Sequence, residues 1–116
     1  MKIEPRIKLL FICSRNQWRS PTAEQVWRKD PRVTARSAGT SEGARRTVTE
    51  DDVGWADVVF AMEDKHLKRL RAVFGSLLAE KTVHVLDIPD EYKYMDPALV
   101  RELEESVARL LGFSLE

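Results

Sequence analysis

Residues 13–20 combine a cysteine, an arginine and a loop in an arrangement suited to attack on a phosphate group. They read Cys-Ser-Arg-Asn-Gln-Trp-Arg-Ser, and they lie between an apolar run and a segment typical of a helix start, Ser-Pro-Thr-Ala-Glu. A loop that leads into a helix N-terminus presents backbone N–H groups to an anion. The same positive end stabilises a thiolate at Cys13, and the guanidinium of Arg19 can bind two phosphate oxygens at once. The pattern therefore predicts a nucleophilic thiolate that faces a bound phosphate.

A structural role for Cys13 is the alternative. A single cysteine at the end of a strand is often a small buried side chain, and its spacing to Arg19 also occurs by chance. The apolar run before the loop and the helix start after it favour catalysis, because together they build the anion site.

Apolar periodicity predicts the elements that must position this loop. Short apolar runs and one weaker alternation predict strands over residues 7–12, 32–37, 57–62 and 81–88. Helices are predicted over residues 20–29, with Ser20 as N-cap, over 63–74, ended by Gly75, and from Asp96 onward. Thr49 is expected to cap a short helical turn.

Strands that alternate with helices indicate an α/β fold. We expect a single domain over residues 1–116, with a four-stranded parallel sheet and helices on both faces. Ligands of such sheets bind beyond the carboxyl ends of the strands. Cys13 follows the first strand, and Asp87 and Asp90 come near the end of the last. The topology therefore brings a carboxylate near the thiolate.

These motifs resemble the low-molecular-weight protein tyrosine phosphatase family. The matching residues follow one another along most of the chain: Phe11-Ile12-Cys13, Asn16, Arg19-Ser20-Pro21, Ala23-Glu24, Ser37-Ala38-Gly39-Thr40, Ala56-Asp57, Ala61-Met62-Glu63 and Ile88-Pro89-Asp90 with Tyr92. The resemblance implies a flavodoxin-like three-layer sandwich with strand order 2-1-3-4. It also implies a cysteinyl-phosphate intermediate that requires no metal and no cofactor.

The resemblance assigns a role to each matching functional residue. It implies that Cys13 is the nucleophile, that Arg19 binds the phosphoryl oxygens, and that Asp90 donates and later accepts a proton. It also implies that Ser20 stabilises the thiolate and that Asn16 braces the loop. The implied phosphate-binding set is Ser14, Arg15, Asn16, Gln17, Trp18, Arg19 and Ser20.

Three aspartates near the last strand are candidates for the general acid. Asp96 precedes Pro97 and an amphipathic helix, which is typical of an N-cap. Asp87 lies within the apolar strand pattern. Asp90 follows Pro89 in a loop and matches the Pro-Asp of the family, so we predict that Asp90 is the acid.

The chain departs from the family at the loop and at the substrate slot. Trp18 replaces a second cysteine, so Cys13 has no thiol partner within the chain. Arg15 replaces a glycine, and a positive φ at that position would be strained. The segment between Thr40 and the third predicted strand is shorter than in the family and lacks the aromatic residue that normally lines the phosphotyrosine slot. The predicted substrate-lining residues are Trp18, Arg45, Arg46, Tyr92 and Tyr94, with packing or plain surface exposure as the alternative for the three aromatics.

The predicted function is metal-independent hydrolysis of a phosphomonoester, and the resemblance implies phosphotyrosine protein as the substrate. Because Arg45 and Arg46 occupy the region that lacks the aromatic residue, an anion-rich substrate is an open alternative: a nucleotide, an RNA phosphate end or a phosphorylated basic protein segment. A phosphate-binding module without catalysis is a further alternative. Arsenate reduction on the same fold needs additional cysteines within the chain or an external thiol, and this chain has one cysteine.

The composition limits the expected partners. Because 19 basic residues balance 19 acidic ones, nucleic acid is expected only as a substrate, and no membrane partner is expected. No apolar run approaches the ~20 residues of a membrane span, residues 1–5 show no signal-peptide pattern, and a lone cysteine fits the cytoplasm. One cysteine and two separated histidines predict no metal site. We expect a monomer or weak dimer, Trp27 and Trp55 in the core, and a solvated helix face over residues 63–69.

Overall fold

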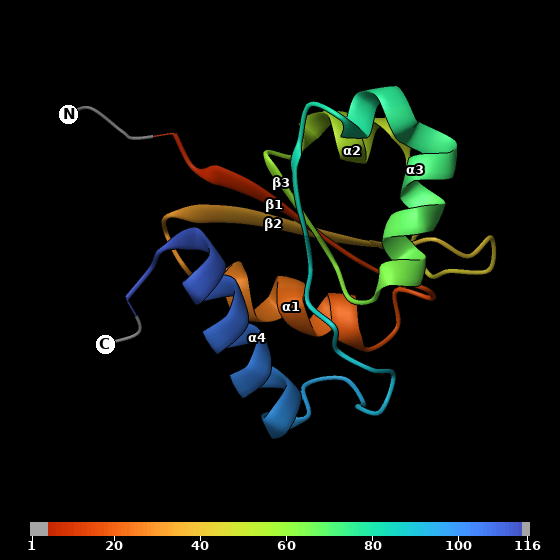
Figure 1. Ribbon diagram of the computed structural model, residues 1–116. Helices are drawn as coiled ribbons and strands as arrows, with labels where there is room; N and C mark the ends of the chain where they lie inside the picture. Colours follow the sequence, from red (N-terminus) through yellow and green to blue (C-terminus); the bar gives the residue numbers. More distant parts are fainter. Residues whose placement is uncertain (1–4, 115–116) are drawn as a thin grey trace.

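The computed structural model describes residues 5–114, which form a parallel sheet with helices on both faces (Figure 1). The strands are β1 (Ile7–Cys13), β2 (Val33–Gly39), β3 (Val58–Ala61) and β4 (Thr82–Val85). The helices are α1 (Arg19–Trp27), α2 (Glu50–Trp55), α3 (Asp64–Leu78) and α4 (Pro97–Leu111). The strand order β2-β1-β3-β4 and the parallel pairing confirm the predicted topology.

Successive side chains of β1 are buried on opposite faces of the sheet, which explains its continuous apolar sequence. Leu9 and Phe11 belong to a core cluster with residues of α1 and α4. Leu10 and Ile12 belong to a second cluster with residues of α2 and α3. Figure 1 shows α1 and α4 on one side of the sheet and α2 and α3 on the other, so the predicted three-layer sandwich is confirmed.

Two helix boundaries differ from the prediction. Helix α1 begins at Arg19, so Ser20 lies inside the helix and is not its N-cap. The hydroxyl of Ser20 instead contacts Cys13 and Asn16. Helix α3 is kinked at Phe74 (φ −122°, ψ 23°), next to the predicted stop at Gly75, but helical residues continue beyond the kink to Leu78. One glycine costs a helix only about 1 kcal/mol, and Leu78, which is buried, anchors the last turn.

Two predicted helix caps are confirmed. Thr49 forms a capping box with Asp52 at the start of α2. The Asp96 side chain accepts the N–H of Ala98 at 2.9 Å and caps α4. Asp96 therefore has a structural role.

The predicted core and membrane properties have mixed outcomes. Trp27 is buried, whereas Trp55 is only half-buried, with the guanidinium of Arg36 4.1 Å from its ring centroid. Over residues 5–114, no helix is long and apolar enough to cross a membrane. The prediction that residues 1–5 have no signal-peptide pattern falls mostly on residues 1–4, which lie outside the described residues.

Candidate active site

Cys13 lies at the carboxyl edge of the sheet, where β1 leads into the loop before α1. Its sulfur is 2.9 Å from Ser20 Oγ, and the residue is buried. Asn16 Nδ2 donates to the same Ser20 oxygen at 3.0 Å. The Ser20 proton is therefore left to donate to the sulfur, because its other acceptor, the Ala38 carbonyl, is 3.5 Å away. A hydroxyl that donates to sulfur stabilises the thiolate over the thiol.

The residue with a positive φ in the loop is Asn16 (φ 54°), and Arg15 is not among the positive-φ residues. The condition for strain at Arg15, a positive φ, is therefore not met. Asparagine adopts this left-handed conformation more readily than most residues. The buried Asn16 amide also donates to Ser37 Oγ at 2.9 Å, which ties the loop to β2. Arg15 is left with an exposed side chain.

Gly39 lets the end of β2 approach the loop. A Cβ at this position would lie 2.4 Å from the carbonyl oxygen of Ser14 and 2.7 Å from Ala44 Cβ. The backbone of Ser14 could move away from such a Cβ only if the whole loop shifted. We therefore expect Gly39→Ala to lower the free energy of unfolding by roughly 2 kcal/mol. Phosphate binding should weaken with it. Denaturant unfolding and phosphate titration measure both effects.

Gly43→Ala is the matched control for that substitution, because a Cβ there meets nothing within 4 Å. Equal stability of the two variants would contradict the close approach at Gly39.

Arg19 is 2% exposed and is held from two sides. Its Nη1 donates to Glu63 Oε1 at 2.6 Å and to the Ile88 carbonyl at 2.7 Å. Its Nε lies 3.7 Å from Asp90 Oδ1. The hydrogen bond from Arg19 lowers the pKa of Glu63, which keeps that carboxylate ionised. The guanidinium is thus fixed beside Cys13 before any ligand arrives.

His66 connects α3 to the loop. Its Nδ1 accepts the backbone N–H of Glu63 at 3.0 Å, so the ring proton is on Nε2. Nε2 lies 2.9 Å from Ser14 Oγ and donates to it. Burial, followed by the charge of Arg19, lowers the pKa of His66 to about 4, so the ring is neutral near pH 7.

The predicted solvated face over residues 63–69 is therefore wrong for Glu63 and His66. His66 is buried, and Glu63 is half-buried against Arg19. Both lie just after β3, at the same sheet edge as Cys13. That position is the signal that could have found them, because it holds for any residue following a neighbouring parallel strand.

The buried neutral His66 predicts a pH-dependent stability. The unfolded chain binds a proton at His66 near pH 6.5, whereas the folded chain binds it near pH 4. The contribution of neutral His66 to the free energy of unfolding is therefore fully present above pH 6.5. It is lost as the pH falls toward 4, which lowers the free energy of unfolding by up to about 3 kcal/mol. Arg19, Lys65, Glu63 and Asp90 also act on the ring. Denaturant unfolding of His66→Gln should show a flatter pH dependence over this range. A slope equal to that of the wild type would contradict the shifted pKa.

Most of the predicted site residues line one cavity of ≈ 220 Å³, which we call the phosphate hollow. Its lining is Cys13, Ser14, Arg15, Gln17, Trp18, Arg19, Lys65 and Asp90. Asn16 and Ser20 lie behind the wall, where they hold the loop and the sulfur. Lys65 was not predicted, and Asp90 is the one aspartate of the three candidates that lines this hollow.

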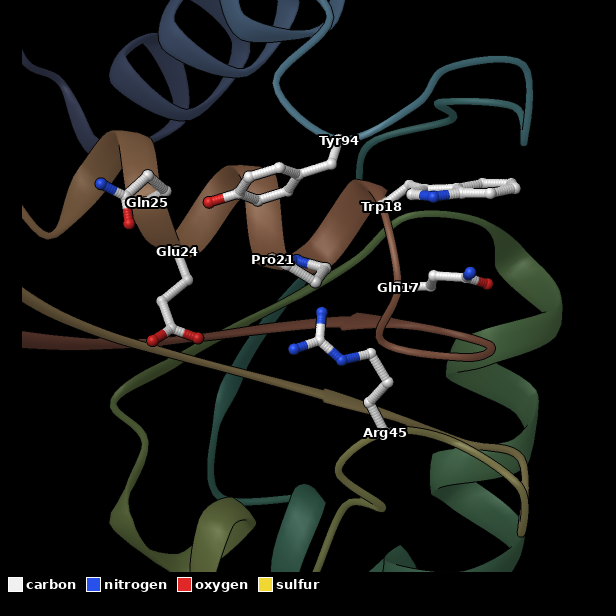
Figure 2. A pocket seen from close by; sticks show the side chains of 7 residues that line it. All are labelled: Gln17, Trp18, Pro21, Glu24, Gln25, Arg45 and Tyr94. Atoms are coloured by element: carbon white, nitrogen blue, oxygen red, sulfur yellow. The ribbon is translucent and has the colours of Figure 1, made fainter.

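A larger groove of ≈ 560 Å³ adjoins the phosphate hollow and shares Gln17 and Trp18 with it. Its other lining residues are Pro21, Glu24, Gln25, Arg45 and Tyr94. Figure 2 shows the Tyr94 ring and the Arg45 guanidinium directed toward the same stretch of α1. The structure therefore brings together three of the predicted substrate-lining residues, Trp18, Arg45 and Tyr94.

Arg46 and Tyr92 lie elsewhere. The Arg46 guanidinium donates to the Ser37 carbonyl at 2.7 Å and pairs with the buried carboxylate of Asp52. Tyr92 is half-buried and packs against the core cluster of α1 and α4. Both side chains have structural partners, and neither lines the phosphate hollow or the groove.

Comparisons with known proteins identify the fold. No family model matches the chain, and no curated protein matches it in sequence. Solved structures match over nearly its whole length. A mutant of YwlE from Bacillus subtilis is 24% identical with a TM-score of 0.67, and the match covers 91% of this chain and 99% of that one.

Two further structures are similar at lower identity. The tyrosine phosphatase Wzb from Escherichia coli K30, in complex with phosphate, is 19% identical with a TM-score of 0.73 and coverages of 93% and 98%. SP-PTP, a low molecular weight protein tyrosine phosphatase from Streptococcus pyogenes, is 17% identical with a TM-score of 0.71 and coverages of 90% and 93%. The chain therefore has the fold of the low-molecular-weight protein tyrosine phosphatases.

Proposed function

We propose that this protein is a cysteine-dependent phosphomonoester hydrolase of the low-molecular-weight protein tyrosine phosphatase type. One observation carries the proposal: Cys13, with its sulfur 2.9 Å from Ser20 Oγ, lines a hollow that Arg19 and Asp90 also line. These groups supply a nucleophile, an electrophilic clamp and a proton donor. The predicted absence of a metal requirement remains part of the proposal.

The chemistry has two steps. The Cys13 thiolate attacks phosphorus, a P–S bond forms, and the P–O bond to the leaving group breaks as Asp90 donates a proton to the departing oxygen. Asp90 then takes a proton from water, the water oxygen attacks phosphorus, and the P–S bond breaks to release phosphate. Arg19 and the loop N–H groups stabilise the negative charge on the phosphoryl oxygens in both steps.

Phosphotyrosine protein is the proposed substrate. Two of the structurally similar proteins are described as tyrosine phosphatases, and Trp18 gives the phosphate hollow one aromatic wall. A binding module without catalysis would not require a carboxylate in the same hollow as Cys13, so the presence of Asp90 there favours the hydrolase. Arsenate reduction would require an external thiol, because Cys13 is the single cysteine of the chain.

Hydrolysis of para-nitrophenyl phosphate in the presence of EDTA tests the proposal. We expect turnover that inorganic phosphate inhibits competitively. Phosphate binding without turnover, measured by calorimetry, would instead support the binding module.

Asp90→Asn should separate good from poor leaving groups. We expect kcat/KM, which reports the steps up to phosphoenzyme formation, to fall by about 10²- to 10⁴-fold on phenyl phosphate, because its leaving oxygen needs a proton, and far less on para-nitrophenyl phosphate. Asp87→Asn is the matched control, since Asp87 is exposed and does not line the hollow. Equal losses on both substrates would argue against Asp90 as the acid, and a larger loss in Asp87→Asn would transfer the role.

A further inference from the structure

The outer wall of the phosphate hollow is polar and basic. Beyond Trp18, the residues that a leaving group would meet are Ser14, Arg15, Gln17 and Lys65. Tyr92 packs against the core and Tyr94 lines the neighbouring groove, so neither provides a second aromatic wall. This wall suits a substrate that carries charge close to its phosphate.

A second hollow of ≈ 510 Å³ continues from this wall, and we call it the basic hollow. Ser14 and Lys65 line both hollows. The basic hollow adds Thr40 and Ser41 from the segment after β2 and Arg69 from α3. Lys65 and Arg69 are four residues apart and therefore lie on the same face of α3.

The charges of the basic hollow are largely uncompensated. Arg69 has no ion-pair partner among the residues that the structure describes, and Lys65 lies 3.9 Å from Glu63, whose carboxylate is engaged by Arg19 at 2.6 Å. One carboxylate, that of the exposed Glu42, lines the same hollow. Two cations and one anion leave a net positive charge beside the phosphate hollow.

Ser14 adds an oriented hydroxyl at the junction. Its oxygen accepts the Nε2 proton of His66 at 2.9 Å, and no acceptor for its own proton is present among residues 5–114. A ligand oxygen at the junction can take that proton. The two basic side chains and this donor point to the same kind of ligand group.

We propose that the basic hollow is a second anion subsite, so that the preferred substrate is a phosphomonoester carrying a second anionic group, a carboxylate or another phosphate. Cys13 and Arg19 hold the phosphate that is cleaved, whereas Lys65 and Arg69 hold the second anion. This inference rests on the proposed function, because it names the substrate class of the same site.

Calorimetry on the Cys13→Ser protein tests the subsite without turnover. The probes are butyl phosphate, the same phosphate with a terminal carboxylate, and the bisphosphate of butanediol, each repeated with an octyl spacer. At fixed ionic strength we expect the second anion to tighten binding about tenfold at one of the two spacer lengths. The carboxylate and bisphosphate arms identify which anion is preferred.

Arg69→Met and Lys68→Met form a matched pair of variants. Each removes one positive charge from an exposed position of α3, but Arg69 lines the basic hollow and Lys68 pairs with Asp64 at 3.2 Å. Arg69→Met should abolish most of the advantage of the second anion and leave butyl phosphate binding unchanged, while Lys68→Met keeps the advantage. Equal affinity for one and two anions at both spacer lengths, or equal losses in the two variants, would overturn the subsite. Absence of para-nitrophenyl phosphate turnover in the wild type would refute the proposed function instead.

Discussion

Replacing Cys13 by serine is expected to abolish turnover and to spare anion binding. A serine hydroxyl is a far weaker nucleophile than the thiolate near neutral pH, so kcat should fall by about 10⁴-fold or more. The loop N–H groups, Arg19 and the Asn16 brace are unchanged by the substitution, and they provide the anion site. Steady-state hydrolysis of para-nitrophenyl phosphate and calorimetric titration with inorganic phosphate measure the two properties separately.

Cys13→Ala serves as the second variant, because it also removes the hydrogen bond to Ser20. Both variants should unfold at denaturant midpoints close to that of the wild type, which shows that lost activity is lost chemistry. Residual turnover above one per cent of the wild-type rate, about 10⁻² in kcat, would argue against a covalent role for the sulfur.

Arg19→Lys is expected to lower kcat/KM by about 10³-fold, mostly through kcat. Lysine keeps the positive charge but loses the planar fork that binds two oxygens. It also cannot reproduce the contacts of the guanidinium with Glu63, Ile88 and Asp90, which fix its direction. Charge alone is therefore insufficient at this position.

Arg28→Lys is the control for the same chemical change. Arg28 is exposed at the C-cap of α1, at the end of the helix remote from Cys13. The kcat/KM of the Arg28→Lys protein should equal that of the wild type. A loss of less than tenfold in a folded Arg19→Lys protein would contradict the placement of Arg19 as the phosphoryl clamp.

The sequence was sufficient to predict the fold, because each strand carries a local signal. Residues 9–12 are apolar on every position, which is typical of a strand buried on both faces. Alternation with helices then restricts the topology to few possibilities. Helix ends were less predictable: Gly75 is a breaker by type, yet the burial of Leu78 extends α3 beyond it.

The candidate site was predictable where its residues are neighbours in sequence or match the family motif, as Asp90 does. Cys13, Arg19 and Ser20 belong to one loop and helix start, whereas Glu63 reaches Arg19 from 44 positions away. A charged helix start such as residues 63–66 has the pattern of a solvated surface, and only the placement of α3 beside the loop buries His66. Arg46 was misjudged for the same reason, since its partner Asp52 is buried by tertiary packing.

Trapping the phosphoenzyme tests the central claim most directly. Asp90→Asn should react with para-nitrophenyl phosphate, whose leaving group needs little protonation, but should hydrolyse the intermediate slowly. Rapid denaturing quench followed by peptide mass spectrometry then locates the phosphoryl group. We predict one phosphoryl group on the peptide that contains Cys13, and none in Cys13→Ser. A phosphoryl group on any other residue, or turnover with no phosphorylated protein, would contradict the cysteinyl-phosphate mechanism.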